Sequence, residues 1–409
     1  MPKERKSLCI LTTVAGSIRT FYPGQIEALN KAGLKTTVIC ADDPNIRDYI
    51  PADTDFYPVE FSRVLSPLRD IKAFLKLYRI FSIRKFDIVQ YSTPKASLLG
   101  SIAAFLARVP IRIYILWGLY YMGQSGLKKL MFKTYERIIC LLSTNIIPIA
   151  HEMVDFVETE GLTKSSKCEV MLNGSACGID LEKFNPERWQ DSHKEIRNSL
   201  NIPESSIVIG TIARLTGDKG INELVTAVDM LCDEIPSLYL LLIGNQEQKD
   251  RLLPSTEQII ANYPRIKAVG WQKNPLPYYA AMDIFCLPTH REGFGKVNLE
   301  AEAMGLPVVS TNIIGPRESV ENGVTGFLVE PKSSKALIEP LKKLILDAGL
   351  RKEMGRKGIE RIKQKFDSKH IIQAVVEHRL KLLGIPYSTP AEKPLRPSKQ
   401  DIIPCGDKK

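Results

Sequence analysis

Short apolar runs alternate with helix-length periodic segments along most of this chain. Runs such as Leu238–Ile243 have the length of a buried strand, and segments such as Pro67–Arg84 have a helical period. This alternation is typical of parallel β-sheets covered by helices, so we predict an α/β fold built of doubly wound parallel sheets. The predicted strands are Leu8–Val14, Thr36–Ala41, Asp87–Tyr91, Arg112–Leu116, Asn145–Ile149, Ile207–Ile212, Leu238–Ile243, Ile266–Val269, Ile284–Leu287, Val308–Ser310 and Phe327–Val329. The predicted helices are Gly24–Ala32, Pro67–Arg84, Ala96–Ala107, Leu127–Leu142, Ile221–Leu231, Leu276–Met282, Val297–Met304, Ser334–Asp347, Arg351–Lys365 and His370–Leu383.

With 409 residues the chain exceeds one ordinary hydrophobic core, and two domains are the expected division. Glycine, asparagine and proline residues interrupt the alternation of strands and helices between Asn173 and Pro186, so we place the domain boundary there. The first domain would span 1–185 and the second 186–367, followed by a helix over 368–384. Residues 385–409 hold five prolines and little apolar content, which predicts a disordered tail.

Composition and cysteine usage are those of a cytoplasmic globular protein. Hydrophobic residues make up 44% of the chain and charged residues 25%. No apolar run reaches the roughly 18 residues that a membrane span needs, and the run behind the basic N-terminus has only strand length, which argues against a signal peptide. The eight cysteines form no CxxC pair and most lie in apolar segments, so we expect reduced core residues.

The excess positive charge lies in the first 150 residues, within the predicted first domain. Residues 1–150 hold 21 Lys and Arg against 11 Asp and Glu, whereas the rest of the chain holds 35 of each. The predicted helix Pro67–Arg84 has an apolar side with Leu68, Ile71, Phe74, Leu75, Tyr78 and Phe81, and a basic stripe on its other side. This stripe is either a solvated outer face or a contact surface for anionic lipid. The basic residues are Arg69, Lys72, Lys76 and Arg79, joined by Lys128, Lys129, Lys133 and Arg137 of the segment Leu127–Arg137.

Two carboxylates, Glu292 and Glu300, accompany a glycine turn in the stretch Arg291-Glu-Gly-Phe-Gly-Lys-Val-Asn-Leu-Glu300. A predicted strand precedes the turn and a predicted helix follows it, so free backbone N–H groups can bind an anion there. Glu292 would lie on the turn and Glu300 about two helical turns deeper. The spacing alone leaves open that Glu292 is a surface loop carboxylate and Glu300 an ordinary acid near a helix N-terminus.

A second strand–turn–helix unit, Gly210–Gly220, carries Arg214 and Lys219. An arginine offers a planar fork for phosphate oxygens, and a lysine offers a movable point charge. Both follow the carboxyl end of a predicted strand, where ligands bind in open α/β sheets. The segment therefore indicates a phosphate site, with two solvated loop cations as the alternative.

The loop Thr12–Thr20 lacks the G-x-G-x-x-G fingerprint of dinucleotide-binding folds. Its Gly16 would let a diphosphate or an acceptor approach the backbone, although a tight turn alone explains the residue. Asp53-Thr-Asp55 matches an Asp-x-Asp metal motif, but it lies between prolines with no further ligands nearby. The five histidines, among them His151 and His290, show no metal-ligand spacing, so we predict no metal site.

Together these segments resemble the retaining glycosyltransferases of family 4, which have the GT-B architecture of two facing Rossmann-like domains. Order and spacing are family-like over residues 200–365. The segments Arg112–Tyr120 and Asn173–Pro186 look like the branch that builds capsular polysaccharide and lipid-linked surface glycans. The motifs that carry the resemblance are Gly210–Gly220, Tyr279-Ala-Ala-Met-Asp-Ile-Phe-Cys-Leu-Pro288, Glu292-Gly-Phe-Gly295, Glu300-Ala, Met304-Gly-Leu-Pro-Val-Val-Ser310 and Gly323-Val-Thr-Gly-Phe-Leu-Val329.

The resemblance implies a role for each candidate residue. Arg214 and Lys219 would hold the donor diphosphate, Glu292 the hydroxyls of the donor sugar and Glu300 those of the ribose. The amides around Gly293, Phe294 and Gly295 would complete the contacts, and Gly16 would lie against the diphosphate from the other domain. The final helix would cross back onto the first domain. Arg214, Lys219 and Glu292 would be the catalytic residues, acting without a metal or other cofactor because fixed cations and amides stabilise the leaving diphosphate.

One position departs from the family pattern. Many members carry a histidine where this chain has Trp117 before Gly118, so a donor-binding role for that histidine is not carried over. Trp117 would either wall the cleft or belong to the core.

On this resemblance we expect a retaining hexosyltransferase or N-acetylhexosaminyltransferase. It would move a sugar from a nucleotide donor, with UDP as the expected nucleotide, to a polyprenyl-diphosphate-linked glycan in capsule, O-antigen or exopolysaccharide synthesis. It would work in the cytoplasm, peripherally on the inner face of the cell membrane, with no nucleic acid as a partner. The alternatives are a sugar-nucleotide epimerase of the same architecture and a non-catalytic membrane scaffold that binds nucleotide-sugars.

Overall fold

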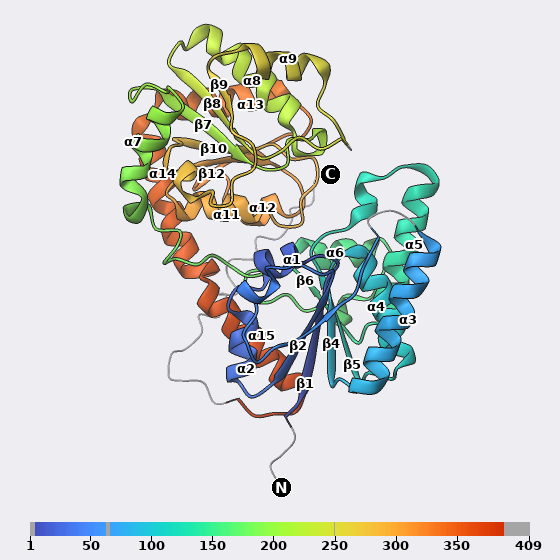
Figure 1. The fold of residues 1–409 in the computed structure, drawn as a ribbon. Coiled ribbons are helices and arrows are strands. Elements are labelled where there is room, and N and C mark those ends of the chain that lie inside the picture. The colour runs from blue at the N-terminus through green and yellow to red at the C-terminus, as the bar shows by residue number, and fades with distance from the viewer. Residues whose placement is uncertain (1–4, 63–65, 249, 388–409) are drawn as a thin grey trace, which may run out of the picture.

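The computed structural model describes residues 5–62, 66–248 and 250–387. Two six-stranded parallel sheets, each covered by helices, form the two halves of the molecule (Figure 1). The predicted α/β class with two Rossmann-like domains is therefore confirmed. The boundary at residues 185 and 186 stays a prediction, and most of the predicted tail, residues 388–409, lies outside the described residues.

The first sheet has the strand order β3-β2-β1-β4-β5-β6. Its helices α1 and α2 precede β2, whereas α3, α4 and α5 follow the next strands in turn (Figure 1). The strands are β1 (Ser7–Leu11), β2 (Lys35–Cys40), β3 (Asp55–Pro58), β4 (Ile88–Tyr91), β5 (Ile111–Leu116) and β6 (Asn145–Pro148). The helices are α1 (Ala15–Phe21), α2 (Gln25–Lys31), α3 (Pro67–Arg84), α4 (Pro94–Leu106), α5 (Gly126–Leu142) and α6 (Glu152–Thr159).

The second sheet has the order β12-β11-β10-β7-β8-β9. Read from β9, with β7 counted as its first strand, this is the same order as in the first sheet. This is the strand order of dinucleotide-binding Rossmann domains. The strands are β7 (Ile207–Ile212), β8 (Leu238–Ile243), β9 (Ile266–Ala268), β10 (Ile284–Leu287), β11 (Val308–Thr311) and β12 (Gly326–Val329). The helices are α7 (Gln190–Ser199), α8 (Ile221–Glu234), α9 (Pro254–Asn262), α10 (Leu276–Ala280), α11 (Lys296–Ala303), α12 (Pro316–Ser319), α13 (Ser334–Leu346), α14 (Ala348–Arg361) and α15 (Ser368–Leu382).

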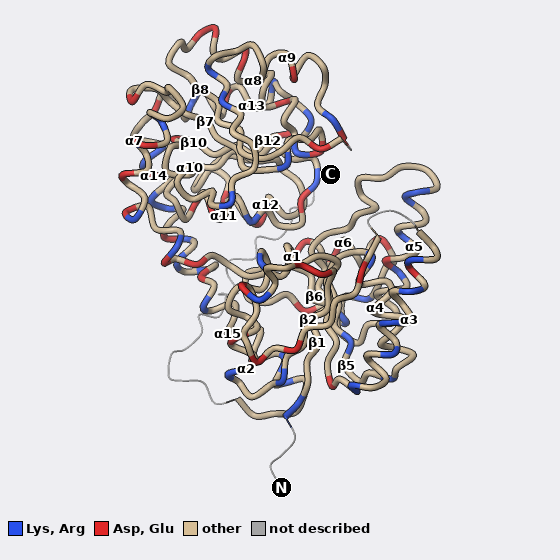
Figure 2. The backbone as a smooth tube through the Cα atoms, in the orientation of Figure 1, with Lys and Arg blue, Asp and Glu red and all other residues tan. Residues whose placement is uncertain are grey.

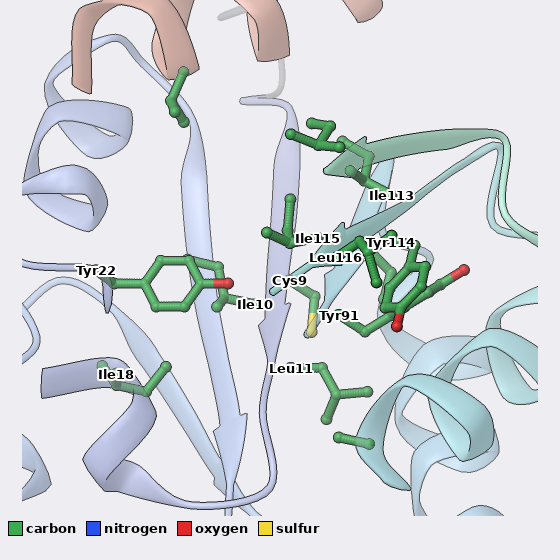
Figure 3. Close-up of a cluster of buried hydrophobic side chains, with 14 of the residues drawn as sticks. Cys9, Ile10, Leu11, Ile18, Tyr22, Tyr91, Ile113, Tyr114, Ile115 and Leu116 are labelled. Carbon is green, nitrogen blue, oxygen red and sulfur yellow. The ribbon is translucent and has the colours of Figure 1, made fainter. Parts of the chain in front are cut away.

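Alternating side chains of the central strands fill the core on both faces of each sheet. In the first sheet, Ile10 lies on the same side as Ile18 and Tyr22 of the α1 region, whereas Leu11 and Tyr91 point to the opposite side (Figure 3). The buried strands read as continuous apolar runs because helices cover both of their faces. That is why the eleven predicted strands all correspond to observed strands.

One prediction for the first domain was wrong, and one strand was not predicted. Residues 15–21, predicted as part of a loop, form the short helix α1, so Gly16 lies in a helix rather than a tight turn. Asp55 begins the edge strand β3, which was not predicted because it is only four residues long and ends at Pro58. Asp55 pairs with Arg84 at 2.5 Å between Nη2 and Oδ2, so this residue of the Asp-x-Asp match makes a structural contact.

The final helix α15 packs against α2 of the first half (Figure 1). It follows α14 and a turn of π-helix at Ile362–Phe366. Buried residues Ile371, Val375 and Val376 belong to the apolar core that also contains β1. The chain therefore returns to the first half, as the resemblance implied.

Candidate functional site

Both sheets have their topological switch point beside their first strand, between β1 and β4 and between β7 and β10. In open α/β sheets, ligands bind outside the carboxyl ends of the strands at this point. The segments that leave β1, β7 and β10 there carry Gly16, Arg214 with Lys219, and Glu292, respectively. The strand order thus brings the predicted residues of the second half to one edge of one sheet.

Lys219 and Glu292 form an ion pair at this edge, with 2.6 Å between Nζ and Oε2. Gly220 makes the pairing possible: it has a φ of +71°, and a Cβ there would lie 1.9 Å from the carbonyl oxygen of Pro288. Burial alone would raise the pKa of Glu292, but the Lys219 ammonium, the Gly293 amide and the Arg291 guanidinium together outweigh burial and lower that pKa. The Gly293 amide, which donates to Oε1 at 3.2 Å, acts in the same direction. The carboxylate is therefore held ionised.

Arg214 lies in the same loop but does not pair with Glu292. Its guanidinium contacts Glu247 at 3.0 Å and Asp218 at 3.4 Å, and its side chain is about half exposed. Asp218 also accepts from Arg291 at 3.3 Å. Burial raises the pKa of Asp218, but the Thr216 hydroxyl and the surrounding cations outweigh it and hold that pKa low. A phosphate bound here would replace these carboxylates as the partner of Arg214 and Arg291.

The glycine turn after β10 lies directly against the first half. A Cβ on Gly293 would lie 1.7 Å from the carbonyl oxygen of Trp117, so only glycine fits this approach. The side chain of Phe294 is buried and packs against Phe366, with ring centroids 5.7 Å apart. Phe294 can therefore serve a donor only through its backbone, and Gly295 caps the N-terminus of α11.

Trp117 has both of the roles considered for it. Its indole packs against Phe21, with ring centroids 4.1 Å apart, and more distantly against Tyr22. Its carbonyl group meanwhile faces Gly293 across the two halves. The partly buried side chain thus packs against the core of the first half, and the backbone lines the candidate site.

Glu300 is buried on α11 and held by two neighbours. Its Oε2 accepts from the Tyr279 hydroxyl at 2.9 Å, and its Oε1 lies 3.1 Å from Lys296 Nζ. Gly16, in α1, has open space in front of it, since a Cβ there would meet no atom within 4 Å. A ligand can therefore approach its backbone.

The histidines near the site make structural contacts. His290 Nε2 lies 3.0 Å from Glu223 Oε1, and His151 Nε2 lies 3.0 Å from the carbonyl oxygen of Leu172. The backbone amides of His151 and Glu152, at the start of α6, both donate to the Glu318 carboxylate of α12 at 2.8 Å. Glu318 thereby links the two halves.

Family models match both halves of the chain. The model described as glycosyl transferases group 1 matches residues 192–361, and the model described as glycosyl transferase 4-like matches residues 8–149. The capsular polysaccharide biosynthesis glycosyltransferase CapM of Staphylococcus aureus is 34% identical over 361 residues, which cover 88% of this chain and 93% of CapM. The chain belongs to the group 1, family-4-like glycosyltransferases.

Two further similarities bear on this glycosyltransferase. The UDP-Gal:alpha-D-GlcNAc-diphosphoundecaprenol alpha-1,3-galactosyltransferase of Escherichia coli is 27% identical, over 79% of this chain and 83% of its own. The crystal structure of Anabaena HepE in complex with UDP-glucose has a TM-score of 0.74 at 21% identity, covering 92% of this chain and 99% of that one. The second similarity shows that the glycosyltransferase shares its GT-B fold with HepE.

Several residues that contact the candidate site residues were not predicted from the sequence. Asp218 and Arg291 lie beside predicted residues in both loops, but only the fold brings the two loops together. Lys296 and Glu300 are four residues apart on a helix, a spacing that predicts an ion pair and could have found Lys296. Tyr279 comes from α10 and is recognisable only from the structure.

The basic surface of the first half differs from the prediction in two ways. Leu68, Ile71, Leu75 and Tyr78, expected on the apolar side of α3, are exposed. Phe81 is buried as expected, together with Ala73 and Leu77. The stripe Arg69, Lys72, Lys76 and Arg79 is exposed as well, so α3 presents apolar and basic residues together. On α5, Lys128 and Lys129 are exposed, but Lys133 is paired with Glu160 at 2.7 Å.

Proposed function

We propose that this glycosyltransferase moves a sugar from a UDP-linked donor to a polyprenyl-diphosphate-linked glycan, with retention of anomeric configuration, in capsule or related surface-glycan synthesis. The observation that carries the proposal is the Lys219–Glu292 pair beside the N-terminus of α11, at the switch point of the second sheet. Cation, carboxylate and helix amides there match the diphosphate, the sugar hydroxyls and the leaving charge of such a donor.

Donor binding would rearrange the charges of the site. A diphosphate would draw Lys219 away from Glu292, and the freed carboxylate would accept hydrogen bonds from the sugar hydroxyls. Arg214 would leave Glu247 or Asp218 in the same way. Breaking the bond between sugar and phosphate builds negative charge on the departing diphosphate, and these fixed cations stabilise that charge in the transition state.

The named relatives support the donor and acceptor classes. The E. coli relative carries in its name a UDP-sugar donor and a diphosphoundecaprenol-linked acceptor, and CapM is named for capsular polysaccharide biosynthesis. The anionic diphosphate of such an acceptor also suits residues 1–150 of the first half, which hold the excess positive charge of the chain.

We further propose that α3 and α5 dock the enzyme on the inner face of the cell membrane. Figure 2 shows Lys and Arg residues along both helices. Next to them, Leu68 of α3 is 78% exposed and Leu127 of α5 is 84% exposed. Basic residues near an anionic lipid surface contribute about 1 kcal/mol each, and exposed leucines can enter the headgroup boundary. Within the described part of the chain, no helix combines the length and hydropathy of a transmembrane segment.

The test is product analysis with purified protein, candidate UDP-sugars and a polyprenyl-diphosphate-linked saccharide. Sugar transfer that requires both substrates, with the donor's anomeric configuration in the product, is the expected result. Conversion of the donor without an acceptor would favour the epimerase alternative. Binding of UDP-sugars without turnover in the presence of any acceptor tested would favour the non-catalytic scaffold.

A further inference from the structure

Lys296 is a cation in an unfavourable place. It is the first residue of α11, where the helix dipole disfavours positive charge, and its side chain is only a quarter exposed. Burial disfavours the charged form of Lys296, but the Glu300 carboxylate and the nearby Cys177 together outweigh burial and raise the pKa of the ammonium. The ammonium thus stays charged, although the helix dipole and burial both disfavour its charge.

The contacts of Lys296 join the two halves of the site. Nζ lies 3.1 Å from Glu300 Oε1 on the same helix and 3.5 Å from the carbonyl oxygen of Thr20 in α1. Thr20 lies in the same helix as Gly16, on the opposite side of the site. The Thr20 carbonyl restricts where the ammonium can lie, so α1 helps to fix its contact with Glu300.

Two donors now hold the two oxygens of one carboxylate. Tyr279 donates to Glu300 Oε2 and Lys296 contacts Oε1, each from the protein side. A carboxylate oxygen has two lone pairs, so each oxygen keeps one for a ligand. Two oxygens fixed in this way suit two neighbouring hydroxyls, such as the vicinal diol of a ribose.

We propose that Lys296 is a positioning residue of the donor site, which orients the Glu300 carboxylate for the two ribose hydroxyls of the nucleotide. The inference rests on the proposed function, because it takes a UDP-linked donor as the ligand. It assigns to Lys296 a selectivity for ribose over deoxyribose, transmitted through Glu300.

The experiment compares the binding of UDP and 2′-deoxy-UDP by isothermal titration calorimetry. The wild-type protein should prefer UDP by about tenfold or more, because a hydrogen bond to a charged oxygen is lost with the 2′-hydroxyl. Lys296→Met should reduce this preference to about threefold or less and raise the donor KM more than it lowers kcat. Lys296→Arg, which keeps a charged donor, should restore the preference.

Control variants separate positioning from folding. Lys357→Met removes a lysine from another i,i+4 pair, with Glu353 at 2.7 Å on α14, and should leave the preference unchanged. Glu300→Gln should lose the preference, and Lys296→Met added to it should cause no further loss. A folded Lys296→Met protein that keeps the wild-type preference would overturn this inference but leave the proposed function standing. A wild-type protein that binds no UDP would overturn the proposed function and the inference together.

Discussion

Lys219 and Glu292 lie 73 residues apart, yet their side chains meet at 2.6 Å. They meet because β7 and β10 are neighbours in the second sheet, so the segments that leave both strands share one edge. Lys296 and Glu300 form a second lysine–glutamate pair in the same region. Each carboxylate proposed to bind hydroxyls is therefore matched by a cation before any donor arrives.

Lys219→Met should lower kcat/KM by about a hundredfold or more, because a fixed cation that stabilises the leaving diphosphate is lost. The single change also leaves Glu292 without its partner, which can destabilise the fold. The double variant Lys219→Met with Glu292→Gln removes both charges and should recover stability but not turnover. Steady-state kinetics and thermal unfolding measured on both variants check this, and near-normal turnover in either would remove Lys219 from the catalytic residues.

Glu136 should make the protein less stable as the pH rises from about 4.5 to 7. Its carboxyl is buried and accepts from the Tyr114 hydroxyl at 2.8 Å, and burial raises the pKa of Glu136 to about 7. The folded state thus holds a proton that the unfolded state releases at lower pH. The resulting stability is fully present below the unfolded pKa and lost as the pH approaches the folded one.

Glu136→Gln removes this titration and keeps an acceptor for Tyr114. The variant should be more stable than the wild type at pH 8, by up to about 3 kcal/mol, and the difference should shrink towards pH 5. Urea unfolding at several pH values gives the comparison directly. A constant difference between the two proteins across this range would show that Glu136 does not titrate as described.

The sequence predicted the strands well and the surfaces poorly, for physical reasons. Strands buried on both faces are apolar runs, whereas β3 and α1 are short and carry polar residues or glycine. In α3, two apolar stripes compete for the core, and the helical period does not tell which one is buried. The packing against α4 selects Leu77 and Phe81 and leaves Leu68 and Leu75 exposed.

The candidate site likewise combines local features that the sequence predicts with contacts that only the fold creates. The motifs predicted the two strand–turn–helix units, because a strand, a glycine turn and a helix N-terminus are local features. The partners of Arg214 could not be predicted, since Glu247 follows a different strand and meets it only in the folded sheet. The contact between Gly293 and Trp117 likewise depends on how the two halves face each other.

Membrane docking should depend on both the basic and the apolar residues of α3. Changing Arg69, Lys72, Lys76 and Arg79 to glutamine should weaken binding to vesicles that contain anionic phosphatidylglycerol, mostly at low salt, because salt screens exposed charges. Changing Leu68, Ile71 and Leu75 to serine should weaken binding at high salt as well. Vesicle co-sedimentation at two salt concentrations separates these effects.

A matched control for the basic variant changes four exposed cations far from α3 to glutamine: Lys352 and Arg356 of α14, Lys363 of the π-helical turn and Lys369 of α15. These changes lower the net charge of the protein without touching α3, so vesicle binding should stay close to that of the wild type. If this control weakened binding as strongly as the α3 variant, net charge rather than the α3 surface would explain the attraction.

Phe294 should hold the glycine turn against the first half. Its side chain is 3% exposed and belongs to the apolar core that contains β1, although the residue itself follows β10. Phe294→Ala should cost about 3–5 kcal/mol of stability, whereas Phe294→Leu should cost less, because leucine refills most of the cavity. Denaturant unfolding measures this difference.

Since the same turn offers its amides to the donor, Phe294→Ala should also weaken UDP binding, and Phe294→Leu should largely preserve it. Unchanged UDP affinity in a folded Phe294→Ala protein would show that the turn keeps its shape without this anchor.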